Sequence, residues 1–397
     1  MSSILKTDAL IKSIKRRGFI PRSQETFTDE DFLEMATEEV NLGLMPFIMK
    51  AHEEALVYSV DITLESGRKK YPIPSRAQGN KLRDVFLADD NGQMYEMFRY
   101  NLDEQSDFSS WVNSGDSRGF YLMNNEVVLT SAPQFVSHSL RMFFYLRPNS
   151  LVLPERSGTI TQLTTVSQLD NLAPQSASIS AISLTGVVTS TAHGYSNSDK
   201  VQITGTNSTP SADGTYTISV IDANSFSIDE TFTVAATTGA SVRVLDCYVL
   251  ALSQVPKHFS QGLLYDLVQN ISPNKITNYD LPCNGVDFVL KQVSIPVASF
   301  KESPVVGQYL TSAEETIVPN IPTELHPILA QRVAIACLEA MGDEQNKQSA
   351  ERKLAQMEMN GMTLIDNRTE GSQQKIKNRH SSLKQSSFYR AQKRFGR

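Results

Sequence analysis

Two neighbouring stretches of different period decide the fold. Residues 28–40 read TDEDFLEMATEEV, and residues 55–65 read ALVYSVDITLE. In the first stretch apolar residues from Phe32 to Val40 recur every three to four positions, and Thr28 opens a capping-box pattern, so a helix is predicted. In the second, apolar and polar residues alternate as in a half-buried strand. The chain therefore changes from helix to strand near residue 54.

The same two periods continue outward. Residues 3–17 predict a short helix that Gly18 and Pro21 end, and Pro46 predicts a kink or break in a helix that runs to about residue 53. Further strands are predicted over residues 81–88, 93–100, 120–130 and 139–147, with a turn at Asn124-Asn125. Helices followed by an antiparallel β-region indicate an α+β fold and not a doubly wound α/β one.

Residues 175–245 differ in composition from the rest of the chain. They contain 25 Ser/Thr in 71 residues and only seven charges, and short strand-like stretches repeat between turns. This spacing predicts a small all-β barrel or sandwich. Residues 247–252 (CYVLAL) then predict a strand that resumes the earlier sheet beside residues 141–147. We interpret the module as an insertion into a loop of a host domain.

The C-terminal third returns to helix. Residues 259–268 predict a short helix and residues 285–296 a strand. Thr323 is predicted to cap a long apolar-striped helix, and a mostly polar helix follows over residues 343–360 with Gly361 as its C-cap.

The predicted fold is α+β: a helical host domain with an antiparallel β-region, plus an inserted all-β barrel or sandwich module. Residues 1–174 and 246–370 form the host domain, residues 175–245 the module, and residues 371–397 a basic arm. With 40% hydrophobic and 20% charged residues, the chain has the composition of a globular protein. No apolar run approaches the roughly 18 residues of a membrane span, so none is predicted.

The net charge of −6 is unevenly distributed. Residues 371–397 contain eight Lys/Arg and no acid, which leaves 29 Lys/Arg against 43 Asp/Glu, about −14, in residues 1–370. Aromatic residues lie among these basic ones, so the arm can dock by stacking as well as by charge. The residues predicted to bind a partner are Lys375, Lys377, Arg379, Lys384, Phe388, Tyr389, Arg390, Lys393, Arg394, Phe395 and Arg397.

Catalytic motifs are absent from the sequence. There is no P-loop, GxSxG or HExxH pattern, and the six histidines are scattered. His52 with its two following glutamates indicates a solvated helix end, and residues 89–92 a hairpin turn and not a calcium loop. The chain has three cysteines, Cys247, Cys283 and Cys337, an odd number at widely spaced positions. This pattern indicates buried free thiols in a protein made in a reducing cytoplasm. We expect no enzymatic activity, no cofactor and no metal site.

Several short patterns follow one another in a characteristic order. They are the acidic-capped helix from Thr28, the kink near Pro46, the strand ending in Thr63-Leu64-Glu65, Tyr71-Pro72-Ile73-Pro74, KLRDVFL over residues 81–87, and the late helix over residues 325–341. In this order they resemble head-to-tail adaptor (connector) proteins of short-tailed bacteriophages. The stretches AHGYSNSDKVQI, GTYTI and DANSF, from residues 192, 214 and 222 onward, resemble a small β-module common in phage structural proteins.

The resemblance implies a structural virion protein in the tail or neck, made in the host bacterial cytoplasm. Twelve copies would form a ring on the portal protein, extend the DNA channel and carry tail nozzle or fibre proteins. DNA would pass without sequence-specific binding, because an acidic body repels phosphate. The alternative is another tail component, such as a nozzle, tail-tube or fibre-attachment protein, and with less support a receptor-binding protein. A DNA-binding role for the basic arm is opposed by the acidic body.

Overall fold

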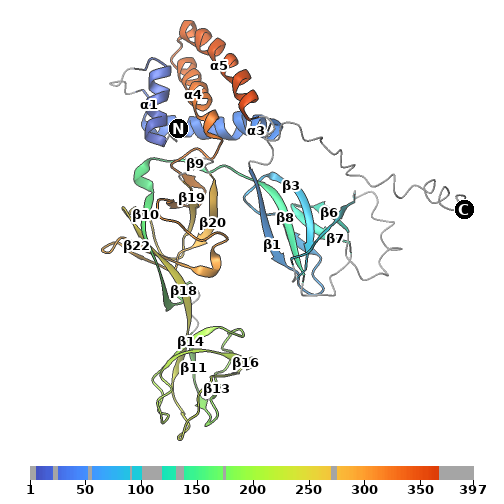
Figure 1. The fold of residues 1–397 in the computed structure, drawn as a ribbon, viewed down its shortest axis with the longest axis vertical. Coiled ribbons are helices and arrows are strands. Elements are labelled where there is room, and N and C mark those ends of the chain that lie inside the picture. The colour runs from blue at the N-terminus through green and yellow to red at the C-terminus, as the bar shows by residue number, and fades with distance from the viewer. Residues whose placement is uncertain are drawn as a thin grey trace, which may run out of the picture.

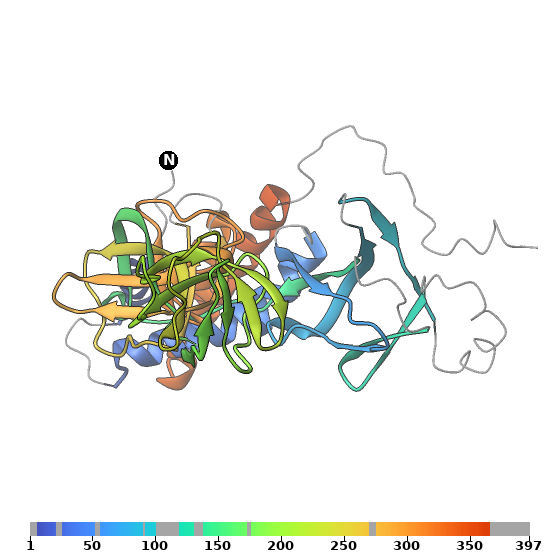
Figure 2. The ribbon, with the colours of Figure 1, turned by 90° about the horizontal axis from the view of Figure 1, so that it is seen from below.

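A computed structural model describes residues 6–20, 26–51, 56–89, 92–100, 119–130, 138–172, 176–269 and 275–365. The structure contains both helices and antiparallel strands, as the predicted α+β class requires. A helical layer lies at one end of the long axis and a small all-β module at the other, with a β-rich body between them and a second β-lobe beside that body (Figure 1). Seen from below, the module lies in front of the body and the lobe stays to one side (Figure 2).

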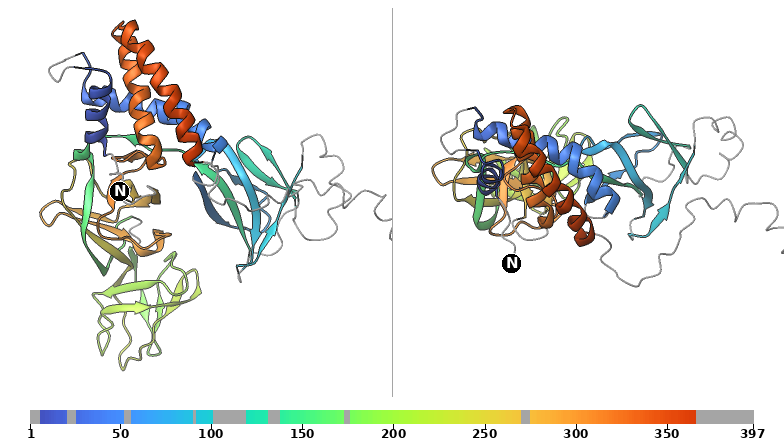
Figure 3. Two further views of the ribbon diagram at one scale, coloured as in Figure 1. Left: turned by 45° about the horizontal axis from the view of Figure 1, so that its top comes forward. Right: turned by 90° about the horizontal axis from the view of Figure 1, so that it is seen from above.

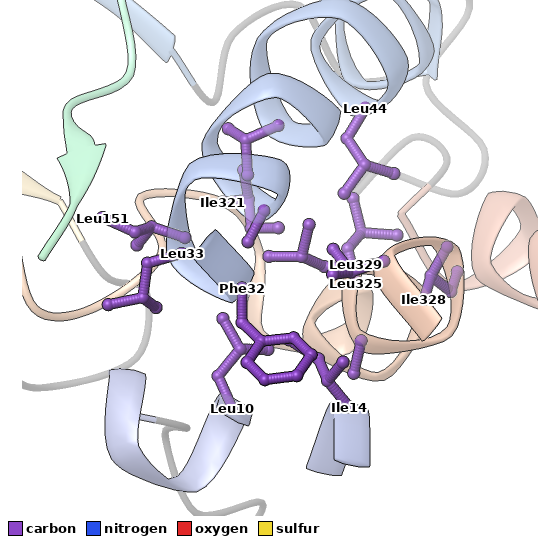
Figure 4. Close-up of a cluster of buried hydrophobic side chains, with 14 of the residues drawn as sticks. Leu10, Ile14, Phe32, Leu33, Leu44, Leu151, Ile321, Leu325, Ile328 and Leu329 are labelled. Atoms are coloured by element: carbon purple, nitrogen blue, oxygen red, sulfur yellow. The ribbon is translucent and has the colours of Figure 1, made fainter. Parts of the chain in front are cut away.

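The helical layer is built from both ends of the sequence. It comprises α1 (Thr7–Arg17), α2 (Asp29–Glu38), the π-helix η1 (Glu39–Leu44), α3 (Met45–Ala51), α4 (His326–Ala340) and α5 (Glu344–Ile365). Figure 4 shows Phe32 of α2 close to Leu10 and Ile14 of α1, and these side chains share one core with Leu329 of α4; all four are fully buried. The layer can therefore form only when distant parts of the chain meet.

The start of α2 confirms the predicted capping box. The Asp31 N–H donates to Thr28 Oγ1 over 3.1 Å, and the Thr28 N–H donates to the Asp31 carboxylate over 2.6 Å. The interruption predicted near Pro46 takes the form of a π-helical turn, after which Pro46 lies in the first turn of α3, where a proline is tolerated.

The β-lobe consists of two four-stranded sheets, ordered β1-β8-β3-β4 and β2-β7-β6-β5. Their strands are β1 (Val57–Thr63), β2 (Lys70–Pro72), β3 (Ala77–Ala88), β4 (Met94–Glu96), β5 (Phe98–Arg99), β6 (Gly119–Met123), β7 (Glu126–Leu129) and β8 (Ser139–Leu146). The predicted turn at Asn124-Asn125 is confirmed: both residues have positive φ, 52° and 59°, and join β6 to β7. Tyr71 and Phe144 are fully buried between the sheets.

The β-body is a curled antiparallel sheet, and β18 is its long central strand. It contains β10 (Gly158–Leu169), β18 (Ala240–Leu252), β19 (Leu264–Val268), β20 (Ile276–Pro282), β21 (Gly285–Asp287), β22 (Gln292–Pro296) and β23 (Tyr309–Ser312). The short strands β9 (Ser150–Leu151) and β24 (Glu315–Thr316) form a separate parallel pair within the body. Three 3-10 turns connect these elements: Pro154–Arg156, Val297–Ser299 and Thr323–Leu325. The amide of Thr7 donates to the Ile317 carbonyl, which ties α1 to this body.

The β-module has a hydrophobic core of its own. Its strands are β11 (Ser176–Ser178), β12 (Ala181–Ile182), β13 (Val187–Thr189), β14 (Lys200–Thr204), β15 (Gly214–Thr217), β16 (Ser219–Asp222) and β17 (Ser225–Ser227). The fully buried members of the core all lie between residues 179 and 236. The module is nevertheless joined to the body by one uninterrupted strand, because β14 pairs with the first half of β18 while β10 and β22 pair with the second half.

The predicted partner of residues 247–252 is wrong. These residues are the second half of β18 and pair with β10 and β22, whereas residues 141–146 belong to β8 in the separate β-lobe. The sequence analysis missed β10. Most of its residues are polar, and four consecutive residues in its second half are exposed, so no alternation of apolar and polar residues marks it as a strand. Without that strand, β8 was the nearest apolar candidate in the sequence.

Four predictions in the C-terminal third are also wrong. Residues 259–268 contain the strand β19 and no helix. β19 lies between β20 and β23 and is buried on both faces, so its apolar residues do not alternate with polar ones. Such a run cannot be told from a buried helix by its hydrophobic period. Thr323 begins a 3-10 turn and does not cap α4. Gly361 lies inside α5, where a Cβ atom would come within 2.6 Å of Ile328 Cδ1, so this glycine serves close helix packing. Residues 285–296 form the hairpin β21–β22 instead of one strand.

Candidate docking end and the joint that positions it

The residues predicted to bind a partner, from Lys375 to Arg397, lie outside the described residues. The structure does place Ile365, the last described residue before the arm. Helix α5 ends at Ile365, which is buried at 7% exposure in the core of the helical layer. α4 and α5 form an antiparallel pair that projects beyond the other helices, and the end of α5 returns toward the β-lobe (Figure 3). The described chain therefore ends at the helical end of the molecule, five residues before the arm begins in the sequence.

The helical end presents charge of both signs. Helix α2 exposes the acidic residues Asp29, Glu30, Glu34 and Glu38. On α1, Lys12 and Arg16 are exposed, while the ammonium of Lys15 lies 2.8 Å from Asp29. Hydrogen bonds from the Thr28 backbone and side chain lower the pKa of the Asp31 carboxyl, so the start of α2 keeps its negative charge down to acidic pH. This end is suited to contacts with charged protein surfaces.

The π-helix η1 is held in place by an ion-pair network. The Arg332 guanidinium lies 3.2 Å from Glu39 and 2.5 Å from Glu358, which links η1, α4 and α5. A Cβ atom on Gly43 would meet the Arg332 guanidinium, so the missing side chain makes room for the cation. The extra residue of the π-turn leaves Leu42 79% exposed on the outer surface. Such π-turns often occur at functional sites.

A buried polar network joins the β-lobe to the β-body. Arg76, just before β3, is 3% exposed, and its Nη2 atom lies 3.0 Å from Oδ2 of the fully buried Asp266 on β19. Arg76 Nη1 lies 3.0 Å from Asp280 Oδ1, and Arg76 Nη2 donates to Asn149 Oδ1 over 2.5 Å. Since Asn149 follows β8, the network lies where the chain leaves the lobe and enters the body.

The network satisfies the buried carboxylate from several directions. Asp266 also accepts hydrogen bonds from the Asn149 side chain over 2.6 Å and from the backbone N–H groups of Asp280 and Glu314. Burial alone would lower the pKa of Arg76, but Asp266 and Asp280 outweigh it, so the pKa is raised. Burial raises the pKa of Asp280 despite Arg76. Arg76 of the lobe is thus paired with carboxylates on two strands of the body, Asp266 on β19 and Asp280 on β20.

The cysteines and two of the histidines among the described residues are buried. Cys247, Cys283 and Cys337 are free and fully buried, and burial raises the pKa of each thiol to about 11. His326 is 1% exposed under the first turn of α4, and burial lowers its pKa to about 4. His193 stacks against Tyr195 inside the β-module. Each of these groups is packed into a core.

The described ranges contain neither a metal-binding cluster nor a membrane-spanning helix. In these ranges no group of three or more His, Cys, Asp or Glu side chains is arranged to hold a metal ion. No helix there combines the length and the apolar character that crossing a membrane requires.

No protein-family model matches the chain, and a search of curated proteins found no match either.

The Arg76 network and the π-helix were both missed from the sequence. One signal was present: Asp266 interrupts the apolar run LLYDLV, and a lone acid in such a run indicates a buried, paired carboxylate. Its partner Arg76 lies 190 positions away, beyond the reach of any local pattern.

Proposed function

We propose that the chain is a structural head-to-tail adaptor of a short-tailed bacteriophage virion. In this proposal copies of the protein form a ring of twelve on the portal protein in the neck, extend the DNA channel and provide a platform for nozzle or fibre proteins. The protein contributes surfaces and no chemistry. The proposal starts from the order of sequence features that resembles this family.

The observation that supports the proposal best is the separation of two different ends. The helical layer, in which the described chain ends at Ile365, and the β-module lie at opposite ends of the long axis (Figure 1). An adaptor has to contact the head with one surface and the tail with another. The helical end and the arm would face the portal, and the β-module would face the tail.

Charge is consistent with a head-to-tail ring. Each copy carries a basic arm for the portal and exposes acidic residues on α2, so the portal side of the ring would present both signs of charge. The rest of the chain, at about −14 over residues 1–370, would let DNA slide through a channel, because like charges repel phosphate.

The domain division is part of the proposal. Residues 175–245 act as an inserted module, and the host domain consists of residues 1–174 and 246–370. Side-chain contacts stabilise the connection between module and body: Lys200 Nζ lies 2.6 Å from Asp246 Oδ2, and Ser167 Oγ donates to Asp246 over 2.6 Å. A module held this way would present its outer face at a fixed angle to a tail protein.

The arm provides the test. Surface ion pairs contribute only about 0–1 kcal/mol each, so buried aromatic anchors should carry most of the affinity. The double variant Phe388→Ala/Phe395→Ala should lose stable attachment to portal-bearing heads even at low salt, measured by co-sedimentation. The matched control Lys393→Arg should attach normally.

Truncation separates protein docking from DNA binding. A chain ending at residue 370 should not attach to heads. If it attaches normally and instead loses salt-dependent retention of duplex DNA, the arm binds phosphate and the assignment of portal docking is wrong.

A further inference from the structure

One edge of β10 is left unpaired. On its inner side β10 pairs with β18 from Ile160 to Leu169. On its outer side Gly158 and Thr159 pair with β23, and the backbone of Ile160 bonds to Gly307 and Gln308. An irregularity in the β10–β18 register at residue 161 marks where the outer partner ends. From there to Leu169, no strand among the described residues pairs with the outer edge of β10.

The ladder with β18 shows which backbone groups face outward. The Asp170 N–H donates to the Arg243 carbonyl, so in this antiparallel register the even-numbered residues of β10 bond to β18. The odd-numbered residues Leu163, Thr165 and Ser167 turn their N–H and C=O groups away from β18. Thr165 and Ser167 are exposed and Leu163 is half-buried, so these backbone groups line a solvent-facing edge.

Nothing in the segment protects this edge. Residues 161–169 read TQLTTVSQL, with no charged residue, proline or glycine. Val166 and Leu169 are each 44% exposed. Proteins usually shield an open edge with lysine, proline, a bulge or a covering loop, because an unshielded edge is a template for another strand. The expected ligand is therefore an extended chain that adds to the sheet.

We propose that this edge binds the same edge of a second copy of the chain, antiparallel and about a two-fold axis at Thr165. In that register Thr165 lies opposite Thr165 of the other copy, and Leu163 lies opposite its Ser167. Every outward-facing residue then meets an outward-facing residue, and each such pair exchanges two backbone hydrogen bonds.

The side chains and the charges also favour a second copy. In the same register Gln162 faces Gln168, and Thr164 faces Val166, a side chain of nearly the same shape. Two neutral edges meet without like-charge repulsion, although the chain as a whole carries −6. An acidic or basic peptide would find no opposite charge on these nine residues.

This contact is separate from the proposed ring. A two-fold pair uses the same surface on both copies, whereas neighbours in a cyclic ring use two different surfaces. The β10 pair describes the free chain, and its failure would leave the adaptor proposal untouched.

A single introduced cysteine tests the register. Opposite residues of such a pair lie about 5.5 Å apart at Cα, within disulfide range, so Thr165→Cys should give a disulfide-linked dimer on mild oxidation. Ser167→Cys is the matched control, because its two copies are offset by four residues, about 13 Å, and cannot bridge. The three native cysteines are fully buried and do not interfere.

A second variant keeps the test decisive without oxidation. Wild-type protein should sediment as a dimer at micromolar concentration, and Thr165→Lys, which places two ammonium groups opposite each other, should sediment as a monomer. The proposal is overturned if the wild type is monomeric, if Ser167→Cys cross-links as fast as Thr165→Cys, or if the lysine variant still dimerises through some other surface.

Discussion

Replacing Arg76 should weaken the joint between β-lobe and β-body more than any surface ion pair can. The variant Arg76→Met keeps a long side chain but leaves the buried carboxylate of Asp266 without its cation. Removing one partner of a buried pair costs about 3–5 kcal/mol. Asp266 would keep hydrogen bonds from Asn149, Asp280 and Glu314, so the expected loss is at the lower end, about 3 kcal/mol.

The chain offers a matched control on the same lobe. Arg141 also holds a carboxylate with two nitrogens, 2.6 and 2.7 Å from Asp61, but both side chains are substantially exposed. Arg141→Met should therefore cost only about 0–1 kcal/mol. Both variants are compared by urea unfolding followed by far-UV circular dichroism, with amide exchange of peptides on the two sides of the joint.

The comparison can refute the reasoning directly. If Arg76→Met is no more destabilising than Arg141→Met, the buried network does not hold the joint. The partner substitution adds a second check: the losses from Arg76→Met and Asp266→Asn should not add in the double variant, because each removes the same buried ion pair.

Three further outcomes are expected. Burial lowers the pKa of His326 to about 4, so between about pH 6.5 and 4 the unfolded chain binds a proton at this residue and the folded chain does not. The free energy of unfolding should therefore fall as the pH drops through that window. In urea titrations at neutral and acidic pH, His326→Gln should remove about 3 kcal/mol of this pH dependence. Gly186→Ala should destabilise the β-module by about 1–3 kcal/mol more than Gly205→Ala in thermal melts, since both glycines have positive φ but only Gly186 faces backbone oxygens; equal effects would contradict this. Residues 175–245 expressed alone should give a β-type circular dichroism spectrum, and a random-coil spectrum would show that the module depends on its host.

Local signals predicted local structure well. The Thr28 capping box and the Asn124-Asn125 turn each lie within a few residues, and both are confirmed. Strand pairing depends on distant segments, and there the sequence analysis failed. The partner of residues 247–252 is β10, a polar strand without an apolar run, and β19 looked helical because both of its faces are buried.

The candidate site shows the same division. The basic arm is evident from composition, but it lies outside the described residues, and its role stays a prediction. The network between lobe and body joins Arg76 and Asp266 across 190 positions, so it is apparent only when the fold brings the residue before β3 against β19. The π-turn at Gly43 is likewise fixed by a tertiary contact, the Arg332 guanidinium, and not by local propensity.

The central claim is tested most directly by electron microscopy of the purified protein mixed with purified portal rings. The proposed function predicts a second ring stacked on the portal, with the α4–α5 end of each copy toward the portal and the β-modules pointing away. Absence of any complex with the portal, or a complex in which the β-modules contact it and the helical ends point outward, would contradict the account.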